Sequence, residues 1–342
     1  MFRQVMVPVG FTTGLLHDPE RPAWSGEGPR PLAWSAWYPA AEGAEATSFG
    51  VPPAAPLFVM GAVAADAPLS EARGTWPVVL LSHGTGGTAA SLGWLACRLA
   101  ATGYIVIGVD HHGNTAAEPY RPEAFLAWWD RPRDLTVLLD RLAAEGPFAR
   151  RLDLADVTAA GFSIGGYTVL ALAGAVTEMA LFRDWAAEQP FVKGPREFPD
   201  IATQIEPLLA TSAPFLAAWE RQSADLRDHR VRAVAALAPA PPVRGFREAS
   251  LTAMGDVAVT IISGEADDEA PWEACALWLS RLIPDCRLHS LGAAVAHYPF
   301  LCEGTKLGRR MLPELFVDPP GIDRRAVHDA VAALTREAFR RA

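Results

Sequence analysis

Cysteine is scarce in this chain: its 342 residues include four, and no two of them form a CxxC pair. Disulfide-stapled folds and structural zinc sites both need cysteines at closer, paired spacing, so both classes are disfavoured. Cys97 lies in an apolar helical stretch, whereas Cys275, Cys286 and Cys302 fall within one C-terminal region. We expect reduced thiols, and a bridge between two of the C-terminal three is the alternative.

Positive charge is in deficit. The chain has 30 Lys and Arg against 39 Asp and Glu, which gives a formal net charge of −9, and its basic runs are short. Nucleic-acid binding depends on clustered basic side chains that neutralise phosphates, so we expect no nucleic-acid partner. HExxH and similar ligand spacings are absent from the sequence, so we expect no metal and no cofactor.

Long hydrophobic runs are missing as well. No apolar stretch of the sequence reaches the about 18 residues that a membrane-spanning helix needs. The N-terminal segment 1–14 has no long apolar run after Arg3, so it does not read as a secretory signal. The sequence therefore predicts a cytoplasmic protein without a membrane span.

What the chain does have is a regular alternation of core-forming segments. Its residues are 50% hydrophobic and 20% charged, as in ordinary globular enzymes. Continuous apolar runs alternate with segments of helical spacing, which predicts one α/β domain over 1–342 with a mostly parallel central sheet flanked by helices. The expected strands are 76–83, 104–111, 156–163, 231–240, 257–264 and 286–294, and the expected helices are 91–103, 131–145, 165–175, 271–282 and 323–342.

Two further segments lie outside this alternation. The aromatic run 30–40, RPLAWSAWYPA, ends near Pro39 and predicts an antiparallel strand close to a sheet edge. Residues 176–230 interrupt the alternation with several helical segments and aromatic side chains such as Trp185. We expect this insertion to be a helical cap or lid over the strand ends, with extra packing helices as the alternative.

The strongest local signal is GFSIGG, in which Ser163 lies between Gly161 and Gly165. The predicted strand 156–163 runs directly into this motif, and the predicted helix 165–175 leaves it. A strand–turn–helix elbow of this kind exposes a nucleophilic serine, and it predicts the α/β-hydrolase fold. The alternative is a helix-capping serine beside packing glycines.

Acyl transfer also needs two N–H donors that bind the carbonyl oxygen as it becomes an oxyanion. The first donor should be the backbone N–H of Ile164, directly after the nucleophile. The second should come from the glycine-rich turn 83–87, HGTGG, which follows a predicted strand. We assign it to the N–H of Thr85, with Gly84 as the fallback. A glycine-rich turn without a catalytic role is the alternative.

The acid and the base follow the serine in chain order in this fold. The segment GEADDEAP follows the predicted strand 257–264 and offers Asp267, with Asp268 as the runner-up. Three histidines remain for the base. His297 is preferred because it lies in a loop after the last strand, whereas His289 lies within a strand and His328 is expected on a helix surface. The predicted triad is Ser163, Asp267 and His297.

Four residues are expected near the substrate. His83, Gly84 and His112 follow predicted strands at the same edge of the sheet, and Trp185 belongs to the insertion. Aromatic residues in the insertion favour a hydrophobic acyl or aromatic group in the substrate.

The ordered motifs WYPA, SHGTGG, VDHHGNT, GFSIGG, GEADDEAP and AHYPFL resemble bacterial serine hydrolases of the platelet-activating-factor acetylhydrolase and dienelactone-hydrolase-like branch. The resemblance covers roughly residues 30–175 and 230–342. It implies Ser163, an acid and His297 as the triad. Dienelactone hydrolases proper carry a cysteine at the serine position. The acetylhydrolases place their acid one strand earlier, where this chain has Ala238-Pro239-Ala240, so the acid is expected to have moved to Asp267.

These predictions together describe a serine esterase that forms an acyl-enzyme on a small-molecule ester. An amidase, a lactamase or an acyltransferase could use the same triad. A binding protein on a catalytically inactive hydrolase fold is the alternative from a different class. The sequence does not indicate an oligomeric state.

Overall fold

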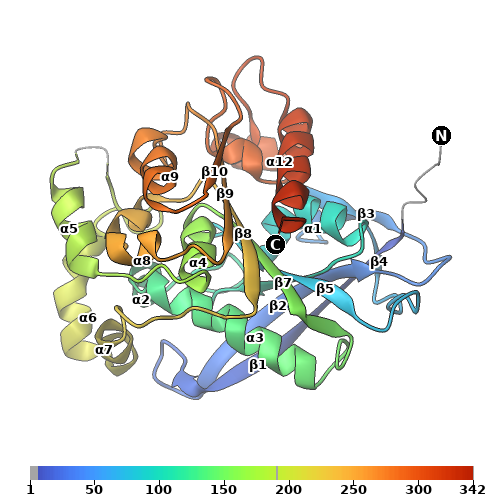
Figure 1. The fold of residues 1–342 in the computed structure, drawn as a ribbon, viewed down its shortest axis with the longest axis horizontal. Helices are drawn as coiled ribbons and strands as arrows, with labels where there is room; N and C mark the ends of the chain where they lie inside the picture. Colours follow the sequence, from blue (N-terminus) through green and yellow to red (C-terminus); the bar gives the residue numbers. More distant parts are fainter. Residues whose placement is uncertain (1–6, 190–191, 342) are drawn as a thin grey trace.

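A single mixed β-sheet runs through the centre of the molecule (Figure 1). The computed structural model describes residues 7–189 and 192–341, so the first six residues, the last residue of the predicted closing helix and two residues of the insertion lie outside it. The strand order is β10-β9-β8-β7-β5-β6-β2-β1-β4-β11, and β3 pairs with β4. The strands are β1 (Val9–Pro22), β2 (Pro29–Pro39), β3 (Thr47–Val51), β4 (Phe58–Ala65), β5 (Trp76–Ser82), β6 (Ile105–Asp110), β7 (Leu152–Phe162), β8 (Val231–Leu237), β9 (Ala258–Ser263), β10 (Arg287–Ser290) and β11 (Glu303–Gly304).

The strands from β5 to β10 are mutually parallel and form the half of the sheet that was predicted from apolar runs. Residues of β5, β6, β8 and β9 are almost all buried because helices cover both faces, whereas the edge strand β10 has no buried residue. Ser82 of β5 pairs with Gly161 of β7, which in turn pairs with Ala236 of β8. The carboxyl ends of these three strands therefore meet at one edge of the sheet.

The other half of the sheet is largely antiparallel. β2 is antiparallel as predicted, but its predicted place near a sheet edge is wrong, because β1 pairs along one side of it and β6 along the other. β1 was not recognised because its sequence lacks a continuous apolar run and contains charged residues and two prolines. Among the described strands, β10, β11 and β3 each pair with a single neighbour.

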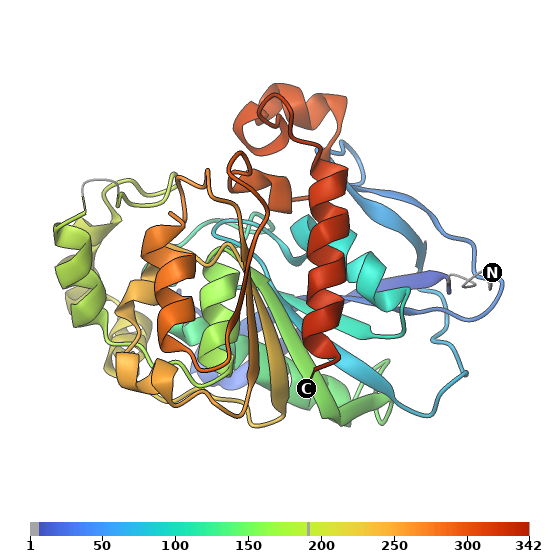
Figure 2. The same cartoon turned by 45° about the horizontal axis from the view of Figure 1, so that its top comes forward.

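Helices cover the two faces of the sheet and bury separate hydrophobic clusters (Figure 2). α1 and α12 pack on one face, and α3 and α4 pack on the other. The predicted helix 271–282 is divided, since a π-helical turn at Glu273–Leu277 precedes α9. The α-helices are α1 (Gly93–Ala100), α2 (Pro122–Leu126), α3 (Arg131–Ala144), α4 (Ile164–Leu172), α5 (Met179–Ala187), α6 (Ile205–Thr211), α7 (Ala213–Glu220), α8 (Glu248–Thr252), α9 (Trp278–Leu282), α10 (Lys306–Met311), α11 (Pro313–Phe316) and α12 (Arg324–Phe339).

The insertion 176–230 contributes α5, α6 and α7, at the left in Figure 1. Its later helices are fixed to the body of the protein. Phe215 of α7 is fully buried, and the indole N–H of Trp129 donates to the Ala218 carbonyl at 2.8 Å. Glu178, just before α5, donates its backbone N–H to the Gly245 carbonyl at 2.7 Å. Both ends of the insertion are therefore tied to the rest of the protein.

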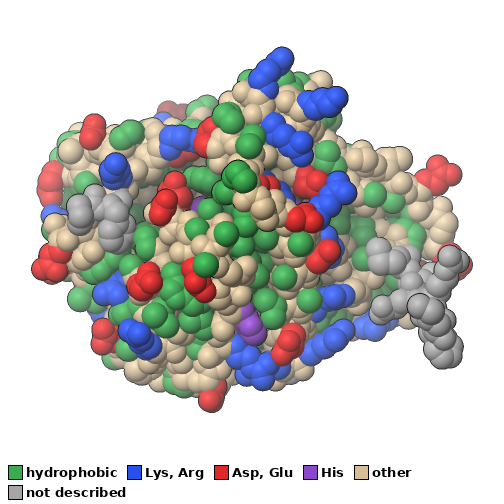
Figure 3. All heavy atoms as spheres, turned by 90° about the horizontal axis from the view of Figure 1, so that it is seen from above, with side chains coloured by type: hydrophobic (Ala, Val, Ile, Leu, Met, Phe, Trp, Pro, Cys, Tyr) green, Lys and Arg blue, Asp and Glu red, His purple; other side chains and the backbone are tan. Residues whose placement is uncertain are grey.

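The molecular surface has a mixed charge. On the face drawn in Figure 3, acidic and basic side chains are interspersed among apolar ones. Of the helices in the described part of the chain, none is both long and apolar enough to cross a membrane. All four cysteines are free thiols.

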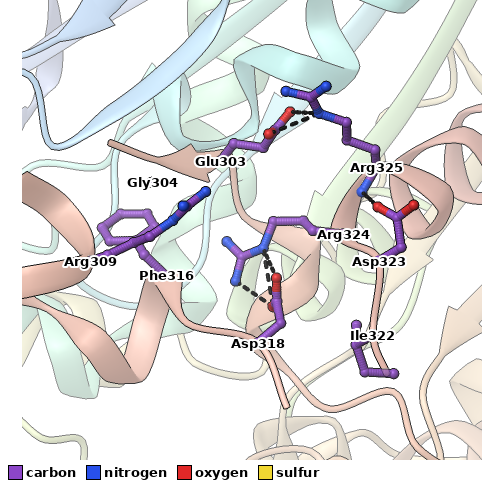
Figure 4. Close-up of a pocket in the computed structure, with 9 residues that line it drawn as sticks. All are labelled: Glu303, Gly304, Arg309, Phe316, Asp318, Ile322, Asp323, Arg324 and Arg325. Carbon is purple, nitrogen blue, oxygen red and sulfur yellow. Dashed lines mark hydrogen bonds and ion pairs between the residues drawn. The ribbon is translucent and has the colours of Figure 1, made fainter. Parts of the chain in front are cut away.

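The C-terminal helix is held at its start by Arg324 (Figure 4). This guanidinium pairs with Asp318 at 2.7 Å and donates to the Cys302 carbonyl at 2.9 Å. It lines a cavity of about 170 Å³ together with Arg325, which pairs with Glu303 at 2.9 Å. The cavity lies between the start of α12 and the segment that precedes it.

His328 is buried within α12, so the expectation that it lies on a helix surface is wrong. Its ring is 2% exposed and stacks on Trp94 of α1 at 3.8 Å between centroids. Its Nε2–H donates to the Leu301 carbonyl at 2.9 Å. Burial lowers the pKa of His328 from 6.5 to about 3, so the ring is neutral in the folded chain at neutral pH.

This buried ring makes stability depend on pH. Below about pH 6.5 the unfolded chain takes up a proton that the folded chain does not, so the contribution of His328 is complete above that pH and is lost as the pH falls. His328→Gln retains an N–H donor for Leu301 but does not titrate. Between pH 7 and pH 5 its free energy of unfolding, measured in urea, should fall by roughly 2 kcal/mol less than that of the wild type. The control His229→Gln, at an exposed position, should retain the wild-type pH dependence. An equal fall in His328→Gln and the wild type would contradict this account.

Candidate active site

The chain turns sharply at Ser163, between the end of β7 and the start of α4. Ser163 has φ 57° and ψ −120°, a left-handed backbone that residues other than glycine rarely adopt. A Cβ atom on Gly161 would lie 2.1 Å from the Gly165 carbonyl oxygen, and one on Gly165 would lie 2.1 Å from the Ser82 carbonyl oxygen. Both positions therefore exclude a side chain, as expected for a tight elbow.

Backbone hydrogen bonds hold this elbow against β8. The Ser163 N–H donates to the Leu237 carbonyl at 2.9 Å, and the Ala240 N–H donates to the Ser163 carbonyl at 3.1 Å. Ile164 opens α4, and its N–H donates to no other residue in the described chain. The positive end of the helix therefore faces the turn with a free donor. Ser163 retains 8% of its surface exposed.

Asp267 and His297 form a direct pair. The His297 Nδ1 lies 2.7 Å from the Asp267 Oδ2. The other carboxylate oxygen, Oδ1, accepts the backbone N–H groups of Glu269 at 3.0 Å and Ala270 at 2.7 Å. Asp267 and His297 are both buried, whereas Asp268 is exposed. The geometry therefore brings together Asp267, rather than Asp268, and the imidazole.

The two loops that carry this pair are bonded to each other. The Ala266 N–H donates to the Val295 carbonyl at 3.1 Å. A Cβ atom on Gly264 would lie 2.0 Å from the same Val295 oxygen, so only glycine allows the loops to approach this closely. The loop after β9 and the loop after β10 are thus fixed side by side.

The imidazole of His297 lies beside the turn at Ser163. The His297 ring centroid is 4.6 Å from that of Phe162, the residue directly before Ser163. In this conformation of the described chain, the Ser163 hydroxyl makes no hydrogen bond to His297. Catalytic hydrogen bonds of this type often form only when substrate closes the site.

The glycine-rich turn after β5 lies next to the elbow. A Cβ atom on Gly84 would be 3.4 Å from the Ser163 Cβ. The turn is closed by a bond from the Gly87 N–H to the Gly84 carbonyl at 3.2 Å, and Asn114 Oδ1 accepts the Gly86 N–H at 2.7 Å. Thr85 is exposed, and its N–H donates to no other residue of the described chain.

A stretch of the insertion reaches this turn. A Cβ atom on Gly86 would lie 2.9 Å from the Glu197 carboxylate, and the neighbouring Phe198 ring is 4.9 Å from that of Phe125. Arg196 forms an ion pair with Glu314 of α11 at 2.5 Å. We call residues 194–200 the strap. It extends from the glycine-rich turn to the C-terminal part of the chain.

The remaining predicted substrate residues have different surroundings. The ring of His83 is fully buried and both of its nitrogens are bonded to protein groups, so it holds the fold rather than offering a free contact. His112 is half-buried and bonds Glu118 at 2.7 Å. Trp185 lies 5.2 Å from the Arg244 guanidinium, whose other side faces Trp278 at 4.1 Å.

Sequence reasoning missed a second Ser-His-Asp set. The Ser82 Oγ lies 3.0 Å from the His111 Nε2, and the His111 Nδ1 lies 2.8 Å from Asp134. All three residues are buried. The signal in the sequence was the serine and histidine at the ends of adjacent apolar runs. Asp134, however, lies inside a helix whose contacts are not local.

The described residues contain no candidate metal centre: within 7–189 and 192–341, no group of three or more His, Cys, Asp or Glu side chains is arranged to hold an ion.

Comparison with known proteins identifies the family. A family model described as serine aminopeptidase, S33, matches residues 75–261, more than half of the chain. No curated protein matches the chain significantly. A solved structure of a ferulic acid esterase from Streptomyces cinnamoneus is similar, with a TM-score of 0.59 and 18% identity over 98% of this chain and 90% of that chain. The chain therefore has the α/β-hydrolase fold and belongs to the S33 serine aminopeptidase family of hydrolases.

Proposed function

We propose that this hydrolase is a serine esterase in which Ser163, His297 and Asp267 act as a catalytic triad. The observation that carries the proposal is the 2.7 Å contact between His297 and Asp267 beside a serine held in a left-handed elbow. In such a triad the carboxylate fixes the tautomer of the imidazole and stabilises its charged form. The two backbone N–H bonds to its other oxygen hold the Asp267 carboxylate in place.

The reaction then has two steps. His297 accepts the hydroxyl proton through Nε2 as Ser163 attacks the ester carbonyl, and it returns that proton to the leaving alcohol. The resulting acyl-enzyme is attacked by water, which His297 activates in the same way, and the acid is released. The N–H groups of Ile164 and Thr85 stabilise the oxyanion in both steps. The mechanism requires no cofactor.

Ester cleavage and amide cleavage are the two candidate activities of the site. The family is described as serine aminopeptidases, so amide cleavage is the second candidate activity. The similar solved structure is an esterase, and the ordered motifs favour the acetylhydrolase and dienelactone-hydrolase-like branch. Matched ester and amide substrates of the same acyl group distinguish the two activities, and an alcohol acceptor tests acyl transfer.

The insertion supports a hydrophobic acyl group as the preferred substrate feature. Its strap contributes Phe198, which stacks edge-on against Phe125 beside the glycine-rich turn. Apolar rings at this position would remove water from the acyl chain of a bound ester. We infer that 176–230 is a cap whose strap forms one wall of the acyl site, while α7 anchors it.

Ser163→Ala tests the nucleophile. Because attack on the carbonyl depends on this oxygen, kcat for short p-nitrophenyl esters should fall by about 10⁴-fold or more. Labelling by a fluorophosphonate probe should also be lost. Ser25→Ala, at an exposed position, is the control and should retain both properties. Wild-type protein that is folded but neither labelled nor active would favour a binding protein instead.

Asp267→Asn and Asp268→Asn form a matched pair that tests the acid. The first change removes the carboxylate that orients His297, so kcat should fall by about 10³- to 10⁴-fold with little change in KM. The second changes an exposed side chain and should leave kcat within about threefold of the wild-type value. The assignment is overturned if Asp268→Asn is the more damaging substitution.

Phe198→Ala tests the strap. Loss of the ring should raise KM for long-chain acyl esters by about 5- to 30-fold, which corresponds to about 1–2 kcal/mol of apolar contact. KM for acetate esters should change much less because their acyl group is too short to reach the ring. Leu216→Ala, on the exposed side of α7, is the control. A uniform KM increase for every chain length would contradict the acyl-site assignment.

A further inference from the structure

In the glycine-rich turn, hydrogen bonds to the Gly84 carbonyl oxygen hold the peptide unit between Gly84 and Thr85 in one orientation. The carbonyl oxygen of Gly84 accepts the Gly87 N–H at 3.2 Å and also contacts the His83 Nδ1 at 2.6 Å. The same peptide unit carries the Thr85 N–H. In a planar trans peptide the C=O and the N–H point in opposite directions. Fixing the Gly84 oxygen therefore aims the Thr85 N–H to the opposite side.

The tautomer of His83 follows from its second hydrogen bond. The backbone N–H of His111 donates to the His83 Nε2 at 3.0 Å, so this nitrogen carries no proton. The ring proton is therefore on Nδ1, where it donates to the Gly84 oxygen. Burial first, and then the charge of Arg131, hold the pKa of His83 well below its ordinary value, so the ring stays neutral with this single tautomer.

Arg131 binds the backbone carbonyl of His83. Its Nη2 donates to the His83 carbonyl at 2.6 Å. The side chain is buried, and its Nε and Nη1 have no partner in the described chain. A buried guanidinium with so few acceptors is costly to the fold. Its main contact is the residue that leads into the turn, which is consistent with a role in positioning rather than in stability.

We propose that His83 is a positioning residue of the oxyanion hole: its Nδ1–H holds the Gly84 carbonyl so that the Thr85 N–H faces the carbonyl oxygen of a substrate bound at Ser163. This inference rests on the proposed esterase function and replaces the earlier expectation that His83 touches substrate. Arg131 supports the same arrangement through the His83 carbonyl. The two residues would act on the transition state, since the donor they aim is used only when the oxyanion forms.

Two substitutions at His83 separate its two hydrogen bonds. His83→Asn has an amide N–H near the place of Nδ1 and retains a donor for the Gly84 oxygen. His83→Gln has an amide oxygen near the place of Nε2, which retains the acceptor for the His111 N–H but loses the donor to Gly84. A purely structural role would make the two variants similar.

The expected result is a loss of kcat confined to one variant. His83→Gln should lower kcat for p-nitrophenyl esters by about 10²-fold, the effect of removing one oxyanion donor, with KM within about threefold. His83→Asn should remain within about tenfold of the wild-type kcat. Affinity for a boronic acid that binds Ser163 as a transition-state analogue should fall in His83→Gln by the same factor as kcat/KM. The exposed control His229→Gln should change none of these values.

Three results would overturn the inference: undiminished kcat in His83→Gln, equal losses in both variants, or a loss that lies in KM alone. If neither variant folds, a crystal structure of the wild-type enzyme with the boronic acid on Ser163 decides. The Thr85 N–H should bond a boronate oxygen while the Gly84 carbonyl faces His83, and a flipped peptide would refute the proposal. Ser163→Ala is assayed in parallel. Activity retained there ends the esterase proposal itself, whereas activity lost there and retained in His83→Gln ends only this inference.

Discussion

The close approach of three backbone segments at the carboxyl edge of the sheet is the constraint on which the site depends. The end of β5, the end of β7 and the start of α4 come together at separations that leave no space for a Cβ on Gly161 or Gly165. Ser163 has a positive φ at this point, and its Cβ lies 3.4 Å from the place that a Cβ on Gly84 would take. The ends of β5 and β7 lie side by side, because the strand register pairs Ser82 with Gly161. Local strain at the serine is thus sustained by the packing of the whole parallel half of the sheet.

A buried network of charges extends this constraint to the N-terminal hairpin. Arg21 of β1 pairs with Asp134 of α3 at 2.5 Å, and Asp134 in turn bonds His111 at 2.8 Å. The Arg21 charge holds the pKa of the Asp134 carboxyl well below its ordinary value, against the opposing effect of burial. His111 then orients the ring of His83 through its backbone N–H. The antiparallel strands, distant in sequence from the elbow, thereby contribute to the geometry of the glycine-rich turn.

The parts of the fold that the sequence predicted are those with local causes. Apolar runs such as 76–83 follow from burial on both faces. In GFSIGG, the need for Gly161 is local, because its Cβ would meet Gly165, whereas the need for Gly165 comes from the distant Ser82 carbonyl. The candidates for the acid and the base could be proposed from the sequence because Asp267 and His297 each follow a predicted strand. β1 escaped notice because it is buried mainly on one face, and the burial of His328 depends on Trp94, which lies more than two hundred residues earlier. The support of the glycine-rich turn by His83 and Arg131 was equally hidden, since their contacts arise only after the sheet has formed.

The described part of the chain brings together two Ser-His-Asp sets. The set with the more continuous hydrogen bonds is not the catalytic candidate. Ser82, His111 and Asp134 form an unbroken chain of short contacts, but the serine is fully buried in a strand. Burial also lowers the pKa of His111 to about 3, so this imidazole does not accept a proton near neutral pH. Ser163 lacks a bond to its histidine in this conformation but has exposure at a strained turn and the free N–H groups of Ile164 and Thr85 nearby. Catalysis requires stabilisation of the charge that develops on the substrate. Access for a substrate and free N–H donors therefore indicate a catalytic serine more strongly than an unbroken chain of Ser-His-Asp hydrogen bonds does. Instead, the hydrogen bonds of the buried set hold together the ends of β5 and β6, which lie next to the candidate site at Ser163.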